Sequence, residues 1–329
     1  MHRQTVINLQ NVLPLGLSDD GQMVNWRDVG ECGFARSFFH TELESYEQLH
    51  SAGVDYETCR SFVEQSDTGI DTLQPTAFIF HMSRCGSTLL ANVMAANERI
   101  VVMSEPPVIS PLLRSLCNDK LRSSIVDPVL LQVLRNVVGA LGRRRRQDQQ
   151  YYMVKFNSWN VLQAQAIQLA FPGVPCLFLY REPAEVMVSL LRRPPGWMEK
   201  RTGAIAISLA GSALDTLLPV EYAGRILQGL VGAGLNIADA CFMNYTELRR
   251  DVLPRLLQRL GIEVDAPVMA NMQAQFERSA KSPWDVAFVD DRCAKQLAAS
   301  GEIGEVSARL LGAQYAALEN STQNFRQSI

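Results

Sequence analysis

The sequence lacks several features that would place it in a familiar class of protein. No uninterrupted apolar run reaches the roughly 18 residues of a membrane-spanning helix. The first ten residues also lack the apolar core of a signal peptide. The seven cysteines are scattered along the chain, without CxxC pairs or the spacing of metal ligands. We therefore expect a protein of the reducing cytoplasm that has no structural zinc.

An excess of positive charge is missing as well. The 329 residues carry a formal net charge of -3, which argues against a protein built chiefly to bind nucleic acid or an anionic membrane. Any basic site must therefore be local. With 47% hydrophobic and 20% charged residues, the chain is globular and long enough to bury a large core.

From Thr76 onward, short apolar runs alternate with amphipathic stretches. The apolar runs are β-branched or aromatic on both faces, as expected for parallel strands that helices cover on both sides. We predict an α/β domain of the P-loop type over residues 76–329, with three layers and a central, mostly parallel sheet. The predicted strands are 77–82, 100–103, 151–156, 175–180 and 240–244, and the predicted helices are 88–97, 107–117, 128–141, 161–171 and 183–192.

Residues 1–75 have a different character and are predicted to form an N-terminal extension packed on the main domain. A hairpin turn is expected at Asp20-Gly21, and the capping-box spacing at Thr41 predicts the start of a short helix. Four aromatic residues are available to dock the extension: Trp26, Phe34, Phe38 and Phe39. The alternative is that this segment forms a lid over an acceptor.

The segment around residues 76–90 predicts a strand, a tight loop and a helix, the geometry that aims backbone N–H groups and a helix dipole at an anion. It departs from the nucleotide-kinase pattern G-x-x-x-x-G-K-S/T, because His81 replaces the first glycine and Ser87 replaces the lysine. The positive charge has moved to Arg84 inside the loop. A phosphorylated donor other than the usual nucleotide is therefore implied.

Ionisable residues stand at the ends of four predicted strands: Arg84, Glu105, Lys155 and Arg181. Ligands of open α/β sheets lie beyond the carboxyl ends of the strands. A phosphoryl-transfer enzyme would need an aspartate at such an end to hold Mg²⁺, and the fourth strand offers Arg181 instead. This favours a metal-free site that uses fixed cations.

Two segments resemble the donor-binding motifs of sulfotransferases that use 3′-phosphoadenosine 5′-phosphosulfate (PAPS). Residues 83–90 resemble the loop that holds the 5′-phosphosulfate, and Arg181 followed by Ser189 resembles the 3′-phosphate motif. Three further features resemble the tyrosylprotein branch and its bacterial relatives: the segment carrying Glu105, the lysine at 155, and the Tyr-x-Glu-Leu motif that begins at Tyr245. The resemblance covers roughly residues 76–260.

The resemblance implies a role for each of these residues. Glu105 is the expected general base, and Arg84 and Lys155 would stabilise the transition state. The expected donor-binding residues are Arg84, Cys85, Gly86, Ser87 and Thr88 for the phosphosulfate, Arg181, Ser189 and Arg193 for the 3′-phosphate, and Tyr245 for the adenine. Ser189 and Arg193 are four residues apart, so one helix face can present both.

The function so predicted is transfer of a sulfuryl group from PAPS to a hydroxyl or phenol of a small molecule or peptide. The product would be 3′-phosphoadenosine 5′-phosphate (PAP), with no metal, nucleic acid or membrane involved. The alternatives are a metal-dependent P-loop kinase and a nucleotide-binding scaffold without turnover.

Three residue-level alternatives remain open. Cys85 is either a low-pKa thiol or a small residue whose N–H matters. His81 is either a structural histidine or a second base. The basic residues 143–146 form either a solvated loop or a patch that steers an acidic acceptor.

Overall fold

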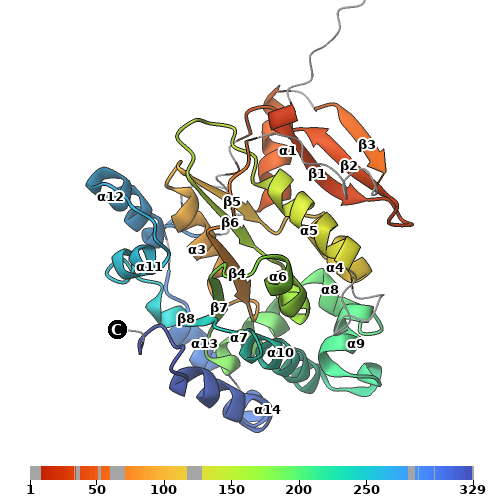
Figure 1. The fold of residues 1–329 in the computed structure, drawn as a ribbon. Helices are drawn as coiled ribbons and strands as arrows, with labels where there is room; N and C mark the ends of the chain where they lie inside the picture. Colours follow the sequence, from red (N-terminus) through yellow and green to blue (C-terminus); the bar gives the residue numbers. More distant parts are fainter. Residues whose placement is uncertain are drawn as a thin grey trace, which may run out of the picture.

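The computed structural model describes residues 9–32, 34, 38–50, 53–59, 71–116, 128–280, 286–287, 289–299 and 301–327. At its centre lies a five-stranded sheet in which each pair of neighbouring strands is parallel, in the order β5-β6-β4-β7-β8 (Figure 1). The strands are β4 (Ala77–His81), β5 (Ile100–Ser104), β6 (Tyr151–Lys155), β7 (Cys176–Tyr180) and β8 (Cys241–Asn244). This confirms the predicted α/β class and its parallel sheet.

Helices flank the sheet, so its strands are buried almost throughout (Figure 1). The helices nearest in sequence to the strands are α3 (Ser87–Ala95), α4 (Ile109–Leu116), α5 (Pro128–Leu141), α6 (Ala164–Ala170), α7 (Pro183–Arg192) and α10 (Pro219–Leu235). Between α7 and α10 lie α8 (Gly196–Glu199), α9 (Ala204–Ala210) and the 3₁₀ turn η3 (Leu214–Thr216).

One predicted helix begins later than expected. Residues 161–171 were predicted to be helical, but the 3₁₀ segment η2 (Ser158–Gln163) comes first and α6 begins only at Ala164. The cause is local: Asn157 and Asn160 cap each other reciprocally at the start of η2, which favours the tighter turn.

The N-terminal region forms a three-stranded antiparallel sheet in the order β1-β2-β3 together with α1 (Phe39–His50). After the turn η1 (Leu9–Asn11), the strands are β1 (Val12–Leu17), β2 (Met23–Asp28) and β3 (Asp55–Cys59). The predicted hairpin turn is confirmed, since Gly21 has a φ of 68° and its N–H donates to the Ser18 carbonyl at 2.8 Å. We call residues 9–59, as far as they are described, the N-terminal unit.

Two arginines of the basic loop hold the N-terminal unit. The Arg143 guanidinium donates to the Val12 carbonyl and lies 5.5 Å from the centroid of the Trp26 ring. The Arg145 guanidinium lies 5.0 Å from the centroid of the Phe34 ring. Burial lowers the pKa of both arginines to about 10. The prediction of a solvated loop is therefore wrong for these two residues, because their cations pack on aromatic faces.

The other two arginines of the loop are also engaged, although they lie nearer the solvent. Arg144 pairs with Asp71 at 2.9 Å, and Arg146 pairs with Glu98 at 2.6 Å and with Asp148 at 2.8 Å. Each of these cations already has an acidic partner. Their positive charge is therefore largely compensated and would attract an acidic acceptor only weakly.

After β8 the chain continues through short helices and returns to the sheet. The elements are η4 (Tyr245–Glu247), α11 (Leu253–Arg259), α12 (Ala266–Ala274), η5 (Gln275–Glu277), α13 (Arg292–Ala298) and α14 (Gly301–Asn320). Helix α14 packs against α7 and α10, and Asn324 then bridges in parallel to Phe242 of β8. In the ranges that the structure describes, no helix has the length and apolarity needed to span a membrane.

Candidate active site

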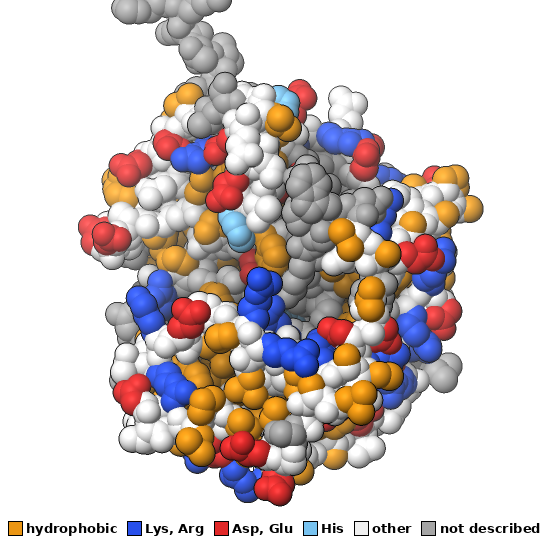
Figure 2. Space-filling model, turned by 180° about the vertical axis from the view of Figure 1, so that it is seen from behind, with side chains coloured by type: hydrophobic (Ala, Val, Ile, Leu, Met, Phe, Trp, Pro, Cys, Tyr) orange, Lys and Arg blue, Asp and Glu red, His pale blue; other side chains and the backbone are white. Residues whose placement is uncertain are grey.

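The predicted site residues collect at the carboxyl edge of the sheet. Arg84 follows β4, Glu105 follows β5, Lys155 ends β6, Arg181 follows β7 and Tyr245 follows β8. Because all five strands are parallel, these positions share one edge. Figure 2 shows one face of the molecule, on which basic and acidic side chains are interspersed and several basic side chains lie near the centre.

The loop between β4 and α3 is built for a close approach to its ligand. Ser83, Arg84 and Gly86 all have positive φ angles, of 74°, 50° and 86°. A Cβ atom on Gly86 would lie 2.6 Å from Leu248 Cδ1 and 2.7 Å from Tyr245 Cδ2, so only glycine fits there. Helix α3 begins at the next residue, and its N-terminal N–H groups and dipole therefore point to this loop.

Two arginines that are distant in sequence meet at this loop. The Arg84 guanidinium donates to the Arg193 carbonyl at 2.7 Å. Burial, and then the nearby charge of Arg193, lowers the pKa of Arg84. Neither arginine forms an ion pair with any residue in the described part of the chain. Two cations that repel each other without a compensating carboxylate form an arrangement that favours binding of an anion.

Glu105 and Lys155 form an ion pair beside this loop. The Lys155 ammonium donates to Glu105 Oε1, and the backbone N–H of Glu105 donates to the Lys155 carbonyl at 2.7 Å. The Lys155 side chain is 1% exposed, whereas that of Glu105 is 22% exposed, so the Glu105 side chain is partly open to solvent. Glu105 has a φ of 58°, which is strained for a residue with a side chain.

His81 lies next to this pair but has bonds of its own. Its Nε2 is 3.9 Å from Glu105 Oε1 and 3.1 Å from the Phe156 carbonyl, while the Ser83 N–H donates to its Nδ1 at 3.1 Å. A ring whose Nδ1 accepts and whose Nε2 donates is the neutral tautomer. These contacts favour the structural interpretation of His81, as a support for the loop.

Arg181 is already paired with carboxylates. Its Nε donates to Glu185 Oε2 at 2.6 Å, and its Nη2 donates to Asp291 Oδ1 at 3.0 Å. The guanidinium also lies 4.1 Å from the centroid of the Tyr245 ring. Asp291 bonds Lys295 of α13 at 2.7 Å as well. The carboxylate of Asp291 therefore binds the guanidinium that the sequence assigns to a 3′-phosphate.

The charge balance holds Asp291 in its ionised form. Its burial opposes ionisation, but hydrogen bonds from Lys295 and Arg181 outweigh that effect and lower the pKa of Asp291. Sequence reasoning missed both Asp291 and Lys295. The charged run at residues 290–292 was visible in the sequence, but nothing in it indicated contact with the end of β7.

The other predicted 3′-phosphate residues are not presented as expected. Arg193 ends α7 as its C-cap, with φ of -148° and ψ of 81°, so it does not share a helix face with Ser189. Its N–H donates to the Ser189 carbonyl at 3.2 Å, and its own carbonyl accepts from Arg84. The prediction of one helix face for both is wrong, because the helix stops just before the Pro194-Pro195 pair.

Cys85, Ser87 and Thr88 complete the loop as buried residues. The Cys85 thiol donates to the Leu179 carbonyl at 3.2 Å, and burial raises its pKa to about 11. The low-pKa thiol alternative is therefore wrong, and Cys85 acts as a small core residue. Tyr245 is half-buried between Gly86 and Arg181, and burial raises the pKa of its phenol.

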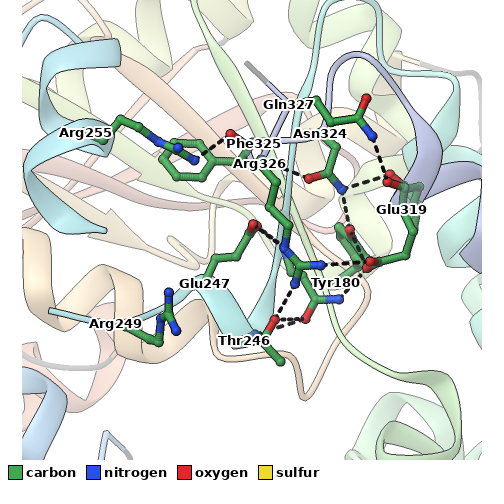
Figure 3. Close-up of polar contacts among 12 residues, drawn as sticks. Tyr180, Thr246, Glu247, Arg249, Arg255, Glu319, Asn324, Phe325, Arg326 and Gln327 are labelled. Atoms are coloured by element: carbon green, nitrogen blue, oxygen red, sulfur yellow. Dashed lines mark hydrogen bonds and ion pairs between the residues drawn. The ribbon is translucent and has the colours of Figure 1, made fainter. Parts of the chain in front are cut away.

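A cleft of about 470 Å³ begins just after Tyr245. It is lined by Thr246, Glu247, Arg249, Asp251, Val252, Arg255 and Arg326. Figure 3 shows Arg326 bonded to Glu247, Glu319 and Thr246. Arg255 donates to the Phe325 carbonyl, and Arg249 pairs with Asp251. Because its arginines have partners, this cleft is less suited to an anion than the loop between β4 and α3.

No group of three or more His, Cys, Asp or Glu side chains is placed to hold a metal ion within the described ranges.

No protein-family model matches this chain. A comparison with curated proteins also gives no match. Among solved structures, the sulfotransferase domain from the curacin biosynthetic pathway is similar, with 15% identity, coverage of 73% of this chain and 98% of that chain, and a TM-score of 0.42. Sulfotransferase STF9 from Mycobacterium avium has 14% identity, coverage of 82% and 80%, and a TM-score of 0.43.

Mouse sulfotransferase SULT7A1, solved in complex with PAP, is a further similar structure. It has 13% identity, coverage of 77% of this chain and 91% of that chain, and a TM-score of 0.39. All three values of the TM-score mark a distant likeness.

Proposed function

We propose that this protein is a PAPS-dependent sulfotransferase of the cytoplasm, related to the tyrosylprotein-like bacterial branch. The observation that carries the proposal is the meeting of Arg84 and Arg193 at a glycine-bearing loop, without a carboxylate partner in the described chain. Two cations at one loop without a carboxylate partner favour a multiply charged anion as ligand. In this proposal the PAPS-binding domain spans residues 76–329, and residues 1–75 are an extension packed on it.

The pair of Glu105 and Lys155 supplies the chemistry. The acceptor oxygen attacks the sulfur, the bond from sulfur to the 5′-phosphate oxygen breaks, and the acceptor proton passes to Glu105. The electron pair of the broken bond stays on the phosphate of PAP, where Arg84 and Lys155 balance the added negative charge. The partly exposed carboxylate of Glu105 supports its assignment as the group that meets the acceptor.

The loop and the ends of β7 and β8 would hold the donor. Gly86, Ser87 and Thr88 lie at the start of α3, where N–H groups can bind the 5′-phosphosulfate, with Cys85 as a small residue in the turn. Ser189, Arg193 and Arg181 remain the proposed 3′-phosphate ligands, and Tyr245 the proposed adenine contact. For Arg181 to serve in this way, the phosphate must displace the carboxylate of Asp291.

Calorimetry with PAP and with ATP tests the proposal directly. We expect PAP to bind without added Mg²⁺, and to bind far more tightly than ATP with or without Mg²⁺. Arg84→Ala should weaken PAP by about 1.5–3 kcal/mol, the range for a hydrogen bond to a charged group. Arg225→Ala is the matched control, because Arg225 is an exposed arginine of α10 paired with Glu221.

The two alternatives give different results in the same experiment. Tight ATP binding that requires Mg²⁺ would favour the kinase and overturn the sulfotransferase proposal. Tight PAP binding with no sulfuryl transfer to any hydroxyl compound would leave the non-catalytic scaffold.

A further inference from the structure

The short turn η4 lies against the loop between β4 and α3. A Cβ atom on Gly86 would lie 2.7 Å from Tyr245 Cδ2 and 3.0 Å from Tyr245 Cε2, so the Tyr245 ring packs on this glycine. The centroid of the same ring lies 4.1 Å from the guanidinium carbon of Arg181. Tyr245 therefore touches two elements of the proposed donor site at once, and the position of η4 determines where its ring stands.

Polar bonds within η4 shape the turn. Asn244 Oδ1 accepts from the Thr246 N–H at 3.0 Å, and Glu247 Oε2 accepts from the Asn244 N–H at 3.0 Å. The Glu247 side chain is only 6% exposed, and burial raises its pKa. A buried carboxylate of this kind is stable in its charged form only beside a cation.

Arg326 supplies that cation and makes a second bond to the turn. Its Nε donates to Glu247 Oε1 at 2.7 Å, and its Nη2 donates to Thr246 Oγ1 at 2.6 Å (Figure 3). Because the guanidinium is planar and rigid, two bonds from one fork fix the orientation of η4 as well as its distance.

The other side of Arg326 is tied to the central sheet. Its Nη1 donates to Glu319 Oε2 at 3.1 Å, and Glu319 Oε1 accepts from the hydroxyl of Tyr180 at the end of β7 at 2.8 Å. The Arg326 N–H donates to Asn324 Oδ1 at 3.0 Å, and the buried Asn324 side chain donates to the same Tyr180 hydroxyl at 2.6 Å. Arg326 therefore joins η4 to a fixed point of the sheet.

The turn has room to move when this bond is lost. The cleft of about 470 Å³ lies beside η4, and its lining includes Thr246, Glu247 and Arg326. On this side η4 borders open space instead of core, so removal of the guanidinium leaves the turn free to shift toward the cleft.

On the basis of the proposed function, we propose that Arg326 is a positioning residue for the donor. Through Glu247 and Thr246 it holds the Tyr245 ring where the adenine of the donor is to pack. Arg326 itself touches neither the loop between β4 and α3 nor Arg181 in any contact of the described chain, so its effect on the donor passes through Tyr245.

Calorimetry with PAP on a double-mutant cycle of Arg326→Ala and Tyr245→Ala tests this route. Arg326→Ala alone should weaken PAP about three- to tenfold, the order of one aromatic contact. In the Tyr245→Ala background the same substitution should change the PAP affinity by less than about twofold, because no ring remains to be misplaced. A general loss of stability or of positive charge would weaken PAP equally in both backgrounds.

Arg309→Ala is the matched control. Arg309 lies on α14 and pairs with Glu221, and its side chain is 56% exposed, against 48% for Arg326. It should keep the wild-type affinity for PAP. Circular dichroism checks that each variant is folded. If Arg326→Ala does not fold, Arg326→Gln keeps one hydrogen-bond donor for Glu247 and takes its place in the cycle, with the same expectation.

Each contrary result points to a different error. Unchanged PAP affinity in the folded Arg326 variant overturns the positioning role. Equal weakening with and without the Tyr245 ring, or similar weakening by Arg309→Ala, overturns the route through Tyr245. Failure of the wild-type protein to bind PAP overturns the proposed function itself, and this inference with it.

Discussion

Replacing Glu105 by Gln should affect both the stability and the chemistry of this protein, and the two effects can be separated. The substitution keeps the shape of the side chain but removes the charge that balances the Lys155 ammonium. Lys155 is 1% exposed and Glu105 is 22% exposed. Breaking a buried ion pair from one side costs about 3–5 kcal/mol. Because water reaches the Glu105 carboxylate, we expect a loss near the lower end, about 3 kcal/mol.

The variant Lys155→Met and the double variant Glu105→Gln/Lys155→Met complete a double-mutant cycle, which measures the interaction energy between the two side chains. Met fills much of the volume of Lys and leaves the charge on the more exposed partner, so its loss should be smaller, about 1 kcal/mol. The double variant has neither charge and should recover much of the stability. With a loss of only about 1 kcal/mol in the double variant, the coupling energy between the two positions should be about 3 kcal/mol, at the upper end of the usual range for contacting residues.

Urea unfolding followed by tryptophan fluorescence and circular dichroism gives the four stabilities. Initial rates with PAPS measure the turnover of each variant. Glu105→Gln should lower turnover by about 10²–10⁴-fold. The double variant should stay as slow although it is stable again. If Glu105→Gln were as stable as the wild type, the ion pair with Glu105 would not be what stabilises the buried Lys155 side chain. Full activity of the stable double variant would refute the role of Glu105 as base.

Three further outcomes follow from other parts of the site. Gly86→Ala should lose about 2–5 kcal/mol of stability, from about 1–2 for its positive φ plus about 1–3 for the contacts its Cβ would make; a urea midpoint like that of the wild type would contradict this. Because burial raises the pKa of Cys85 to about 11, little thiolate exists at pH 8, and mass spectrometry should show iodoacetamide labelling at the exposed Cys59 and Cys293 well before Cys85. The Cys85 rate should rise with pH toward 11, and rapid labelling at pH 7 would be inconsistent with the burial. Asp291→Asn should tighten PAP about two- to fivefold in calorimetry, because it removes a carboxylate from the proposed 3′-phosphate site; weaker PAP binding would place the phosphate elsewhere.

The elements of the main domain were predictable because their signals are local. Helices α5 and α7 begin and end at the predicted residues, since each starts with a proline at its first position and continues in one apolar period. The five central strands were predicted to within a residue at either end. Their apolar runs are short and are bounded by turn residues.

The parts that sequence reasoning missed depend on contacts between distant segments. Strand β3 carries alternately exposed side chains and only becomes a strand by pairing with β2. The bond between Arg181 and Asp291 spans 110 positions of the chain, and it requires α13 to pack on α7. The positive φ of Glu105 has no local signal either, because its backbone is held by the Lys155 carbonyl on the next strand.

Residues 323–325 pair with a strand that is synthesised about 80 residues earlier. The Phe242 N–H donates to the Gln323 carbonyl at 3.0 Å, and the Phe325 N–H donates to the Phe242 carbonyl at 2.8 Å, so this segment covers the edge at β8. Phe325 is also buried in the core. While the chain is still on the ribosome and residue 325 has not emerged, that edge is open to any other extended chain.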